Sequence, residues 1–391
     1  MQRRKDNKGR VLNKGEIQRE DGLYMYQYKA LDGKRKSIYS RDLNELRKKE
    51  KQICMDLEDG INTENSSRSL NDQFEFFLSL KKDIALSTKN HYISMWNNNV
   101  RNERIASKSL CDIRKSDILM LYSKRLETNL SYPSLKELDS LLFRCFEMAV
   151  DDECIRKNPC KGCINGFFSE TKKKEALTAD EQNDYLAFLK GDSKYSVHYP
   201  MVAFMIETAL RCGELTGLTW NDVDFSRRRL SVNHQMKYVK FPDGYKCVID
   251  TPKTASGIRV IPLTEFTAHL LLKQKKMQLE MNKRTDVEID GYKNFVFSSR
   301  NKKPFTASSI NQILYNSVNA YNSIHERKMK HISAHTLRHT GCTRMAEAGV
   351  DIKVLQYLMG HSDVSVTMNV YNHISDERCL KEVKKLEKII V

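Results

Sequence analysis

The chain has 391 residues, enough for two or three domains with cores of their own. Its 66 lysines and arginines exceed its 50 aspartates and glutamates and give a net charge of +16, which favours a polyanionic partner, nucleic acid first. A hydrophobic content of 40% excludes global disorder. Because we find neither an apolar leader nor a long apolar run, we expect a cytoplasmic protein with no membrane-spanning segment.

Ten cysteines are too sparse for a disulfide framework, so we predict reduced thiols. One pair, Cys160 and Cys163, has the CxxC spacing of zinc and redox sites. No second pair and no nearby pair of histidines completes a set of four ligands. We therefore interpret this stretch as a loop with two free thiols and not as a metal site.

The first 51 residues form a strongly basic segment, with 16 lysines and arginines against eight aspartates and glutamates. Asp21-Gly22 and Asp32-Gly33 are hairpin signals between short apolar-alternating runs. The pattern predicts three strands and then a helix, at residues 11–18, 23–31, 34–40 and 42–57. The helix would cover one sheet face, and the other would present basic residues and tyrosines to a DNA groove. The alternative is a solvated basic module.

A polar stretch at residues 62–69 is interpreted as a first linker, and a second is placed at residues 160–175. Between them the apolar spacing is helical, with helices predicted to begin near Leu70, Ser87, Lys115 and Ser131. A capping box at Thr178 and Glu181 then opens a third domain. We expect domains over residues 1–66, 67–160 and 175–391.

Two segments of the third domain place a cation where a phosphate could use it. Arg211 follows an apolar helix over residues 201–210 and precedes Gly213, which could end that helix, so we expect the arginine at a helix end with Glu214 or a phosphate as partner. Lys253 is predicted near the tip of a hairpin that turns at Gly257. A lysine there is usually just solvated, but one that reaches a phosphate oxygen can protonate a leaving alkoxide.

Two further segments carry histidines. His335 and Arg338 are spaced i, i+3 and share one helix face, while His331, His335 and His339 form a series that a metal could use. Arg338 would repel a divalent cation, so we disfavour a metal. His361 lies between Gly360, expected to end one helix, and Ser362, expected to cap another. Tyr371 follows ten residues later, and alone it would be a packing residue.

The ordered set Arg211, Lys253, His335, Arg338, His361 and Tyr371 resembles the tyrosine recombinase (phage integrase) family. The match covers the third domain motif by motif, and the first two domains look like those of conjugative-transposon integrases. The resemblance implies a multidomain fold, mainly α with small β-sheets. An arm-binding three-stranded sheet with a helix would precede a helical core-binding domain and a mixed α/β catalytic domain.

The resemblance also implies roles for these residues. Tyr371 would attack DNA and form a 3′-phosphotyrosyl link, which conserves the energy of the broken phosphodiester without ATP. Arg211 and Arg338 would hold the phosphate, and His361 would donate a further hydrogen bond. His335 would assist proton removal from Tyr371, and Lys253 would protonate the departing 5′ oxygen. The family needs no metal or other cofactor. Glu214 would support the arginines.

The implied partners are double-stranded DNA, with core sites and arm-type repeats, and further copies of the chain in a homotetramer on two duplexes. An excisionase is a possible additional partner for excision of the mobile element. An amphipathic helix predicted over residues 377–391 could pack on a neighbour or on its own domain. Two alternatives stay open: a catalytically silent DNA-binding protein and a type IB topoisomerase, which shares these residue types.

Overall fold

The computed structural model describes residues 4–30, 33–58, 68–168, 175–252, 254–281, 285 and 287–371. The chain divides into two compact units, Met1–Lys172 and Lys173–Val391. The first unit contains two separate hydrophobic cores, one in the basic N-terminal module and one among the helices that follow. No helix within the described ranges is long and apolar enough to cross a membrane.

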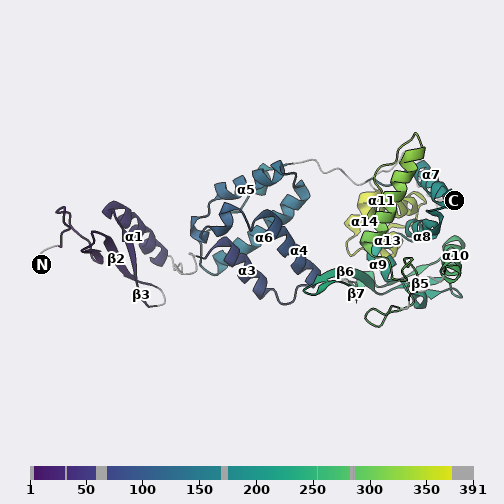
Figure 1. Ribbon diagram of the computed structural model, residues 1–391, viewed down its shortest axis with the longest axis horizontal. Helices are drawn as coiled ribbons and strands as arrows, with labels where there is room; N and C mark the ends of the chain where they lie inside the picture. Colours follow the sequence, from purple (N-terminus) through teal and green to yellow (C-terminus); the bar gives the residue numbers. More distant parts are fainter. Residues whose placement is uncertain are drawn as a thin grey trace, which may run out of the picture. The chain divides into compact units, whose positions relative to one another are not determined.

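The N-terminal module is an antiparallel sheet in the order β1-β2-β3 with helix α1 packed on it (Figure 1). Its elements are β1 (Glu16–Gln18), β2 (Tyr24–Lys29), β3 (Arg35–Ser40) and α1 (Leu43–Glu58). Gly22 and Gly33 have left-handed φ values of 80° and 83°, which the turns between the strands require. The predicted three strands and helix are confirmed, although β1 is shorter than expected.

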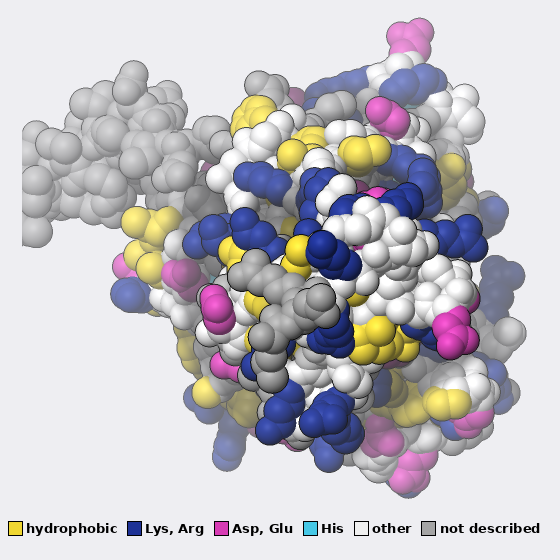
Figure 2. All heavy atoms as spheres, turned by 90° about the vertical axis from the view of Figure 1, so that its left-hand side faces the viewer, with side chains coloured by type: hydrophobic (Ala, Val, Ile, Leu, Met, Phe, Trp, Pro, Cys, Tyr) yellow, Lys and Arg dark blue, Asp and Glu magenta, His cyan; other side chains and the backbone are white. Residues whose placement is uncertain are grey.

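The tyrosines of β2 lie on the core side of this sheet. Tyr24 and Tyr26 pack with Leu43 and Leu46 of α1, so the expectation that the tyrosines share the exposed face is wrong for these two. Tyr39 of β3 is 46% exposed. An alternating strand puts every second side chain against the helix, and Tyr24 and Tyr26 occupy those positions. Figure 2 shows many Lys and Arg side chains on the protein surface, in agreement with the net charge of +16.

The second part of the first unit is helical, as predicted. Its long helices are α3 (Leu70–Leu80), α4 (Leu86–Asn99), α5 (Lys115–Glu127) and α6 (Tyr132–Asp151). Ser131 caps α6, and Pro133 lies in its first turn, where no backbone donor is lost. The core is built around Phe74 and Trp96, whose rings stack at 4.1 Å. Most of the predicted first linker, residues 62–67, lies outside the described residues.

The cysteines of the CxxC pair belong to this helical core. Cys160 and Cys163 are free thiols, as predicted, but they are buried, with exposed fractions of 1% and 0%. The predicted second linker therefore begins at two cysteines that belong to the helical core, and not after that core. Burial raises the pKa of both thiols, which keeps them neutral packing groups.

The second unit is a helical assembly with two small sheets (Figure 1). Its helices are α7 (Ala179–Gly191), α8 (Tyr199–Thr208), α9 (Cys212–Gly217), α10 (Glu265–Glu280), α11 (Ala307–Ile324), α12 (Ala334–Glu347), α13 (Ile352–Met359) and α14 (Val364–Tyr371). Its strands are β4 (Val223–Asp224), β5 (Arg229–Val232), β6 (Gln235–Phe241), β7 (Gly244–Asp250) and β8 (Arg259–Pro262). The capping box of Thr178 and Glu181 opens α7 as predicted.

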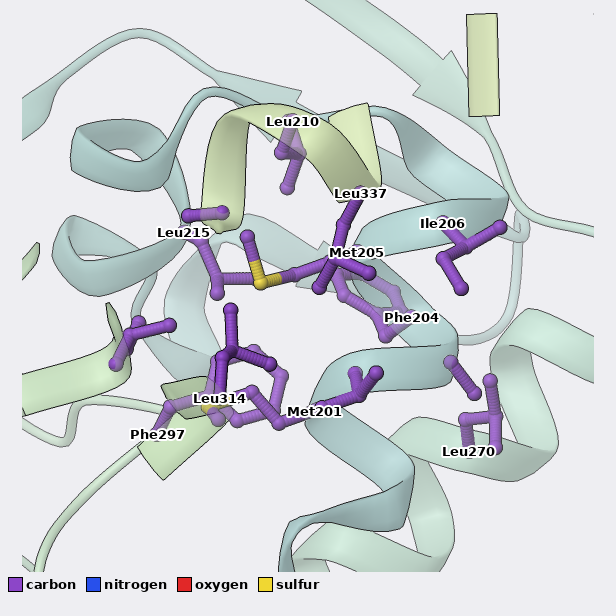
Figure 3. Close-up of a cluster of buried hydrophobic side chains, with 14 of the residues drawn as sticks. Met201, Phe204, Met205, Ile206, Leu210, Leu215, Leu270, Phe297, Leu314 and Leu337 are labelled. Carbon is purple, nitrogen blue, oxygen red and sulfur yellow. The ribbon is translucent and has the colours of Figure 1, made fainter. Parts of the chain in front are cut away.

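Helix α8 runs through the centre of this unit. Its buried side chains, among them Met201, Phe204 and Met205, contact Leu215 of α9 and side chains of α10, α11 and α12 in one continuous core (Figure 3). Gly341 of α12 lets that helix approach α8 closely, because an added Cβ would lie 2.0 Å from the Ile206 carbonyl oxygen. The core thus fixes α12, which carries Arg338, and α9, which begins directly after Arg211.

The strand pairing differs from the hairpin predicted around Gly257. Strand β7 pairs with β6, and β8 pairs with β5, so the two strands that flank Gly257 do not pair with each other. The tight turn is instead at Asp243-Gly244, where Gly244 has a left-handed φ of 124°. Residues 255–257 form a single 3-10 turn between the two sheets. The predicted helix at 377–391 lies outside the described residues.

Candidate active site

Arg211 begins a helix and does not end one. Helix α8 stops at Thr208, Ala209 takes a left-handed φ of 49°, and Arg211 is the N-cap of α9. Its backbone N–H donates to Glu214 Oε2 at 2.9 Å, a capping arrangement that the sequence prediction missed because Gly213 suggested a helix end. Arg211 does lie at a helix terminus, as predicted, but at the start of α9 and not at the end of α8.

Glu214 joins two arginines. Its carboxylate accepts from Arg211 Nη1 at 2.9 Å and from both terminal nitrogens of Arg259, at 3.0 and 2.9 Å. Burial alone would raise the pKa of Glu214, but the bonds from Arg259 and Arg211 hold it below its ordinary value. The predicted supporting role of Glu214 agrees with this geometry.

Arg259 is the member of this cluster that the sequence prediction missed. Its side chain is fully buried at 0% exposure, on the inward face of β8. A charged side chain at a core-facing strand position needs a buried partner, and that alternation with Ile261 was a usable signal in the sequence. Nothing in the pattern, however, identified Glu214, 45 residues away, as the partner.

Helix α12 supplies His335 and Arg338, on one face as predicted. Arg338 is 6% exposed and donates to the carbonyls of Ala209, at 2.7 Å, and Met359, at 2.6 Å. Burial lowers the pKa of Arg338 to about 9, with the charge of Arg211 adding to the effect. The guanidinium therefore stays charged at neutral pH, but it lacks a carboxylate partner of its own among the described residues.

The C-terminal end of α13 is held by three arginines. The consecutive carbonyls of Leu358, Met359 and Gly360 accept from Arg259, Arg338 and Arg211, at 2.7, 2.6 and 2.7 Å. These carbonyls form the negative end of the helix dipole, which favours cations. Gly360 caps the helix with a left-handed φ of 61°, as predicted, and an added Cβ would lie 2.9 Å from Arg259 Nη1. The segment that carries His361 is thereby fixed.

His361 follows this cap and lies between two partners. Its Nε2 is 3.0 Å from Arg338 Nη2, and its Nδ1 is 3.0 Å from Thr367 Oγ1. Burial lowers the pKa of His361 to about 4, and the charges of Arg338, Arg211 and Arg259 contribute. The imidazole is therefore neutral at pH 7. Asp363, and not Ser362, precedes α14 and accepts from the Ser365 N–H, so the capping residue was predicted one position early.

These groups surround one cavity of about 460 Å³. It is lined by Arg211, Cys212, Ala334, His335, Arg338, His361 and Ser362. Four of the six predicted site residues are thus brought together from three separate stretches of the chain. Three guanidinium groups face one carboxylate here, and His361 is neutral, so the site carries an excess of positive charge. Such a site suits a phosphate, which takes bidentate bonds from arginine.

The cavity lining does not include the other two predicted residues, Lys253 and Tyr371. Lys253 lies outside the described residues. The backbone of α14 extends to Tyr371, but the Tyr371 side chain lies outside the described part. Their roles stay predictions.

The cavity lining does not favour metal binding or thiol chemistry. Within the described ranges, no group of three or more His, Cys, Asp and Glu side chains could hold a metal ion, and this includes the series from His331 to His339. Cys212 lines the cavity, but burial raises the pKa of its thiol to about 11. A neutral thiol is a poor nucleophile, so the cavity chemistry is that of an arginine-rich anion site.

Comparison with known proteins assigns this fold and site to a family. Residues 175–378 match the phage integrase family, and residues 1–57 match the DNA-binding domain of Tn916 integrase. The transposase from transposon Tn1545 of Streptococcus pneumoniae is 33% identical, covering 99% of this chain and 97% of that protein. The transposase from transposon Tn916 of Enterococcus faecalis is 32% identical with the same coverage.

A solved structure agrees with these relatives. The Tn1549 transposon integrase, in complex with a circular intermediate DNA, has a TM-score of 0.75 and 31% identity, covering 82% of this chain and 100% of that one. The chain therefore belongs to the phage integrase family and is a tyrosine recombinase. The predicted family and the predicted fold class, mainly α with small β-sheets, are confirmed.

Proposed function

We propose that this recombinase cuts and rejoins DNA strands through Tyr371 and thereby integrates and excises a conjugative transposon. The observation that carries the proposal is the cavity in which Arg211, His335, Arg338 and His361 meet with an excess of positive charge. Helix α14 leads from this cavity to Tyr371. Relatives over nearly the full length are transposon transposases, which supports the biological role.

In the proposed first step, the phenolic oxygen of Tyr371 attacks the phosphorus of the scissile phosphodiester. The bond from phosphorus to the 5′ oxygen breaks, and a 3′-phosphotyrosyl ester forms. Arg211 and Arg338 stabilise the negative charge on the non-bridging oxygens, which rises in the transition state. His335 takes part in removing the phenolic proton, and Lys253 gives a proton to the departing 5′ oxygen.

In the second step, the 5′ hydroxyl of a partner strand attacks the phosphotyrosine and releases Tyr371. One phosphoester replaces another in each step, so no ATP is needed. DNA is the partner of this site, and the match of residues 1–57 to a DNA-binding domain supports a second DNA contact in the N-terminal module. We extend the proposal to arm-type repeats for that module.

Strand exchange between two duplexes requires more than one active site, and we propose a homotetramer. The lambda integrase, which shares the fold at 17% identity and a TM-score of 0.54, was solved as a tetramer bound to a Holliday junction. An excisionase for the excision direction stays a prediction from the sequence.

The test is trapping of the covalent intermediate. The whole chain is incubated with a synthetic duplex that spans one end of the element carrying the gene and has a nick beside the cleavage point. Cleavage releases the short strand between the cleavage point and the nick, so the covalent adduct cannot be religated. The adduct is detected as a protein band carrying labelled DNA. We expect the adduct with the wild-type chain and none with Tyr371→Phe, while DNA binding by both is equal.

A second duplex distinguishes the remaining alternatives. Joined products between two duplexes indicate a recombinase, whereas relaxation of supercoiled plasmid without strand exchange would indicate topoisomerase activity. Tyr315, a half-exposed tyrosine on α11, provides the matched control. An adduct that survives Tyr371→Phe, or that disappears with Tyr315→Phe instead, would show that the nucleophile is assigned wrongly.

A further inference from the structure

Thr367 places a buried hydroxyl against the histidine of the active site. Its side chain is 0% exposed, and its Oγ1 lies 3.0 Å from His361 Nδ1. The opposite ring nitrogen, Nε2, lies 3.0 Å from Arg338 Nη2. His361 is therefore held on both ring nitrogens, by a guanidinium on one side and a hydroxyl on the other.

The partners determine where the ring proton lies. A guanidinium has donors only, so Nε2 must accept from Arg338. The neutral ring then carries its proton on Nδ1 and donates it to Thr367 Oγ1. In this state His361 has no N–H directed to the arginine side of the ring.

A bound phosphate reverses this requirement. Phosphate oxygens beside Arg338 accept hydrogen bonds, so His361 contributes to their binding only with the proton on Nε2. Nδ1 of a neutral ring then becomes an acceptor and needs a donor. A hydroxyl can both donate and accept, so Thr367 keeps its bond to Nδ1 in either tautomer. A carbonyl or carboxylate partner would support only the Nδ1–H forms.

Thr367 also connects the site to the helix of the proposed nucleophile. It lies in α14 four residues before Tyr371, which is about one helical turn. His361 lies outside that helix, in the segment after the Gly360 cap. The hydrogen bond between the two therefore links α14 to the segment that three arginines hold in place.

We propose that Thr367 is a positioning residue of the recombination reaction. Its hydroxyl orients His361 with Nε2 toward the phosphate, accommodates the change of tautomer when DNA binds, and anchors α14 one turn before Tyr371. It acts through His361 and does not itself contact the phosphate. This inference rests on the proposed function, because the phosphate site beside His361 and the role of Tyr371 are part of that proposal.

The test compares two substitutions in the full chain. Thr367→Val keeps the branched shape and removes the hydroxyl, whereas Thr367→Ser keeps the hydroxyl. The rate of adduct formation is measured with saturating protein on the nicked duplex. We expect Val to be about 10- to 100-fold slower, by analogy with the groups that orient metal-binding histidines, and Ser to restore most of the rate. DNA affinity should not change.

A matched control separates this effect from the loss of any buried hydroxyl. Thr267 of α10 is 3% exposed, and its Oγ1 donates to the Thr264 carbonyl at 2.9 Å. Thr267→Val should leave the rate of adduct formation unchanged. If Thr367→Val is poorly folded, Thr367→Ala removes the same hydroxyl without a new methyl contact, and the comparison with Ser stands.

A double-mutant cycle decides whether Thr367 acts through His361. In a His361→Ala background, Thr367→Val should cost much less than in the wild-type chain. The inference is overturned if Val reacts at the wild-type rate, if Ser is as slow as Val, or if the full penalty remains without His361. Adduct formation by Tyr371→Phe would overturn the proposed function instead, which keeps the two failures apart.

Discussion

Two regions of this protein bury a carboxylate against arginine, and they differ in the sign of the charge left over. In the N-terminal module, Glu16 is fully buried and contacts one arginine, Arg47, at 2.9 Å and a second carboxyl group, Glu50. In the cavity, Glu214 contacts Arg211 and Arg259, and Arg338 lies beside them. The first region has surplus acid and the second has surplus cation.

The excess negative charge in the N-terminal module and the excess positive charge in the cavity are neutralised in different ways. Burial and the neighbouring Glu16 raise the pKa of Glu50 to about 7, so below about pH 7 a proton neutralises the extra carboxylate. The guanidinium of Arg338 stays protonated, since its pKa falls only to about 9. Among the described residues no further carboxylate pairs with Arg338, so the remaining charge in the cavity favours an anion from outside. The surplus of arginine therefore supports the proposed phosphate site, whereas protonation of Glu50 relieves the surplus of glutamate within the fold.

Removing the guanidinium of Arg338 should have the largest effect of the substitutions considered, on the rate of adduct formation. Arg338→Ala is expected to slow adduct formation by about 10²- to 10³-fold, the cost of losing one preorganised donor to a developing oxyanion. The control is Arg344→Ala, on the same helix, whose guanidinium donates to Gln182 Oε1 and lies away from the cavity lining. Single-turnover adduct formation on the nicked duplex measures both. A rate for Arg338→Ala within tenfold of wild type would contradict the assignment of the phosphate site.

Removing the arginine that pairs with each buried glutamate tests how strongly the two regions depend on that pair. Arg259→Met leaves Glu214 buried with half of its bonds and should lower the free energy of unfolding of the second unit by about 3–5 kcal/mol. Arg47→Met should cost the N-terminal module less, because Arg47 is 37% exposed and Glu16 still accepts from the Asn13 N–H. Hydrogen exchange of β8 and β2 amides measures the two regions separately. Equal losses would contradict the difference in burial.

Short-range signals explain most of what the sequence predicted correctly. The capping box of Thr178 and Glu181, the helix start near Ser131 and the Gly360 helix end all depend on residues within one helical turn. The order of the arginine, histidine and tyrosine motifs was sufficient to indicate the family. These signals fix local conformation and chemistry.

Long-range pairing explains the errors. Gly257 suggested a hairpin because glycine permits a turn, but which strands pair is decided by contacts far along the chain, here β5 with β8. Asp243-Gly244 was the stronger hairpin signal in that stretch. Arg259 was missed for the same reason: its strand position indicated a buried partner, but only the folded core brings Glu214 to it.

The second unit, which contains the cavity, should become less stable in acid. The pKa of His361 is lowered from 6.5 to about 4, so between these values the unfolded ring binds a proton that the folded ring does not. Stability of the second unit should therefore fall as pH drops from 6.5 through 4. Trp220 fluorescence in a Trp96→Phe background reports this unit, with unfolding by urea at each pH. His361→Gln should flatten the slope, and an unchanged slope would exclude His361 as its source.

The N-terminal module should respond in the opposite direction, with a smaller effect because Glu50 is only partly buried. The folded Glu50 carboxyl keeps a proton up to about pH 7, whereas the unfolded group loses it near 4.5. Stability of this module should therefore fall as pH rises from 4.5 to 7. The pKa of the neighbouring Tyr26 is raised, mainly by burial, so its phenol does not titrate in this window.

Hydrogen exchange of β2 amides, corrected for the intrinsic pH dependence, measures the effect. Glu50→Gln should remove it, because a neutral amide can donate to Glu16 at every pH. A module that instead gains stability from pH 4.5 to 7 would show that Glu50 is ionised beside Glu16, and the contrast with the arginine-rich cavity would fail.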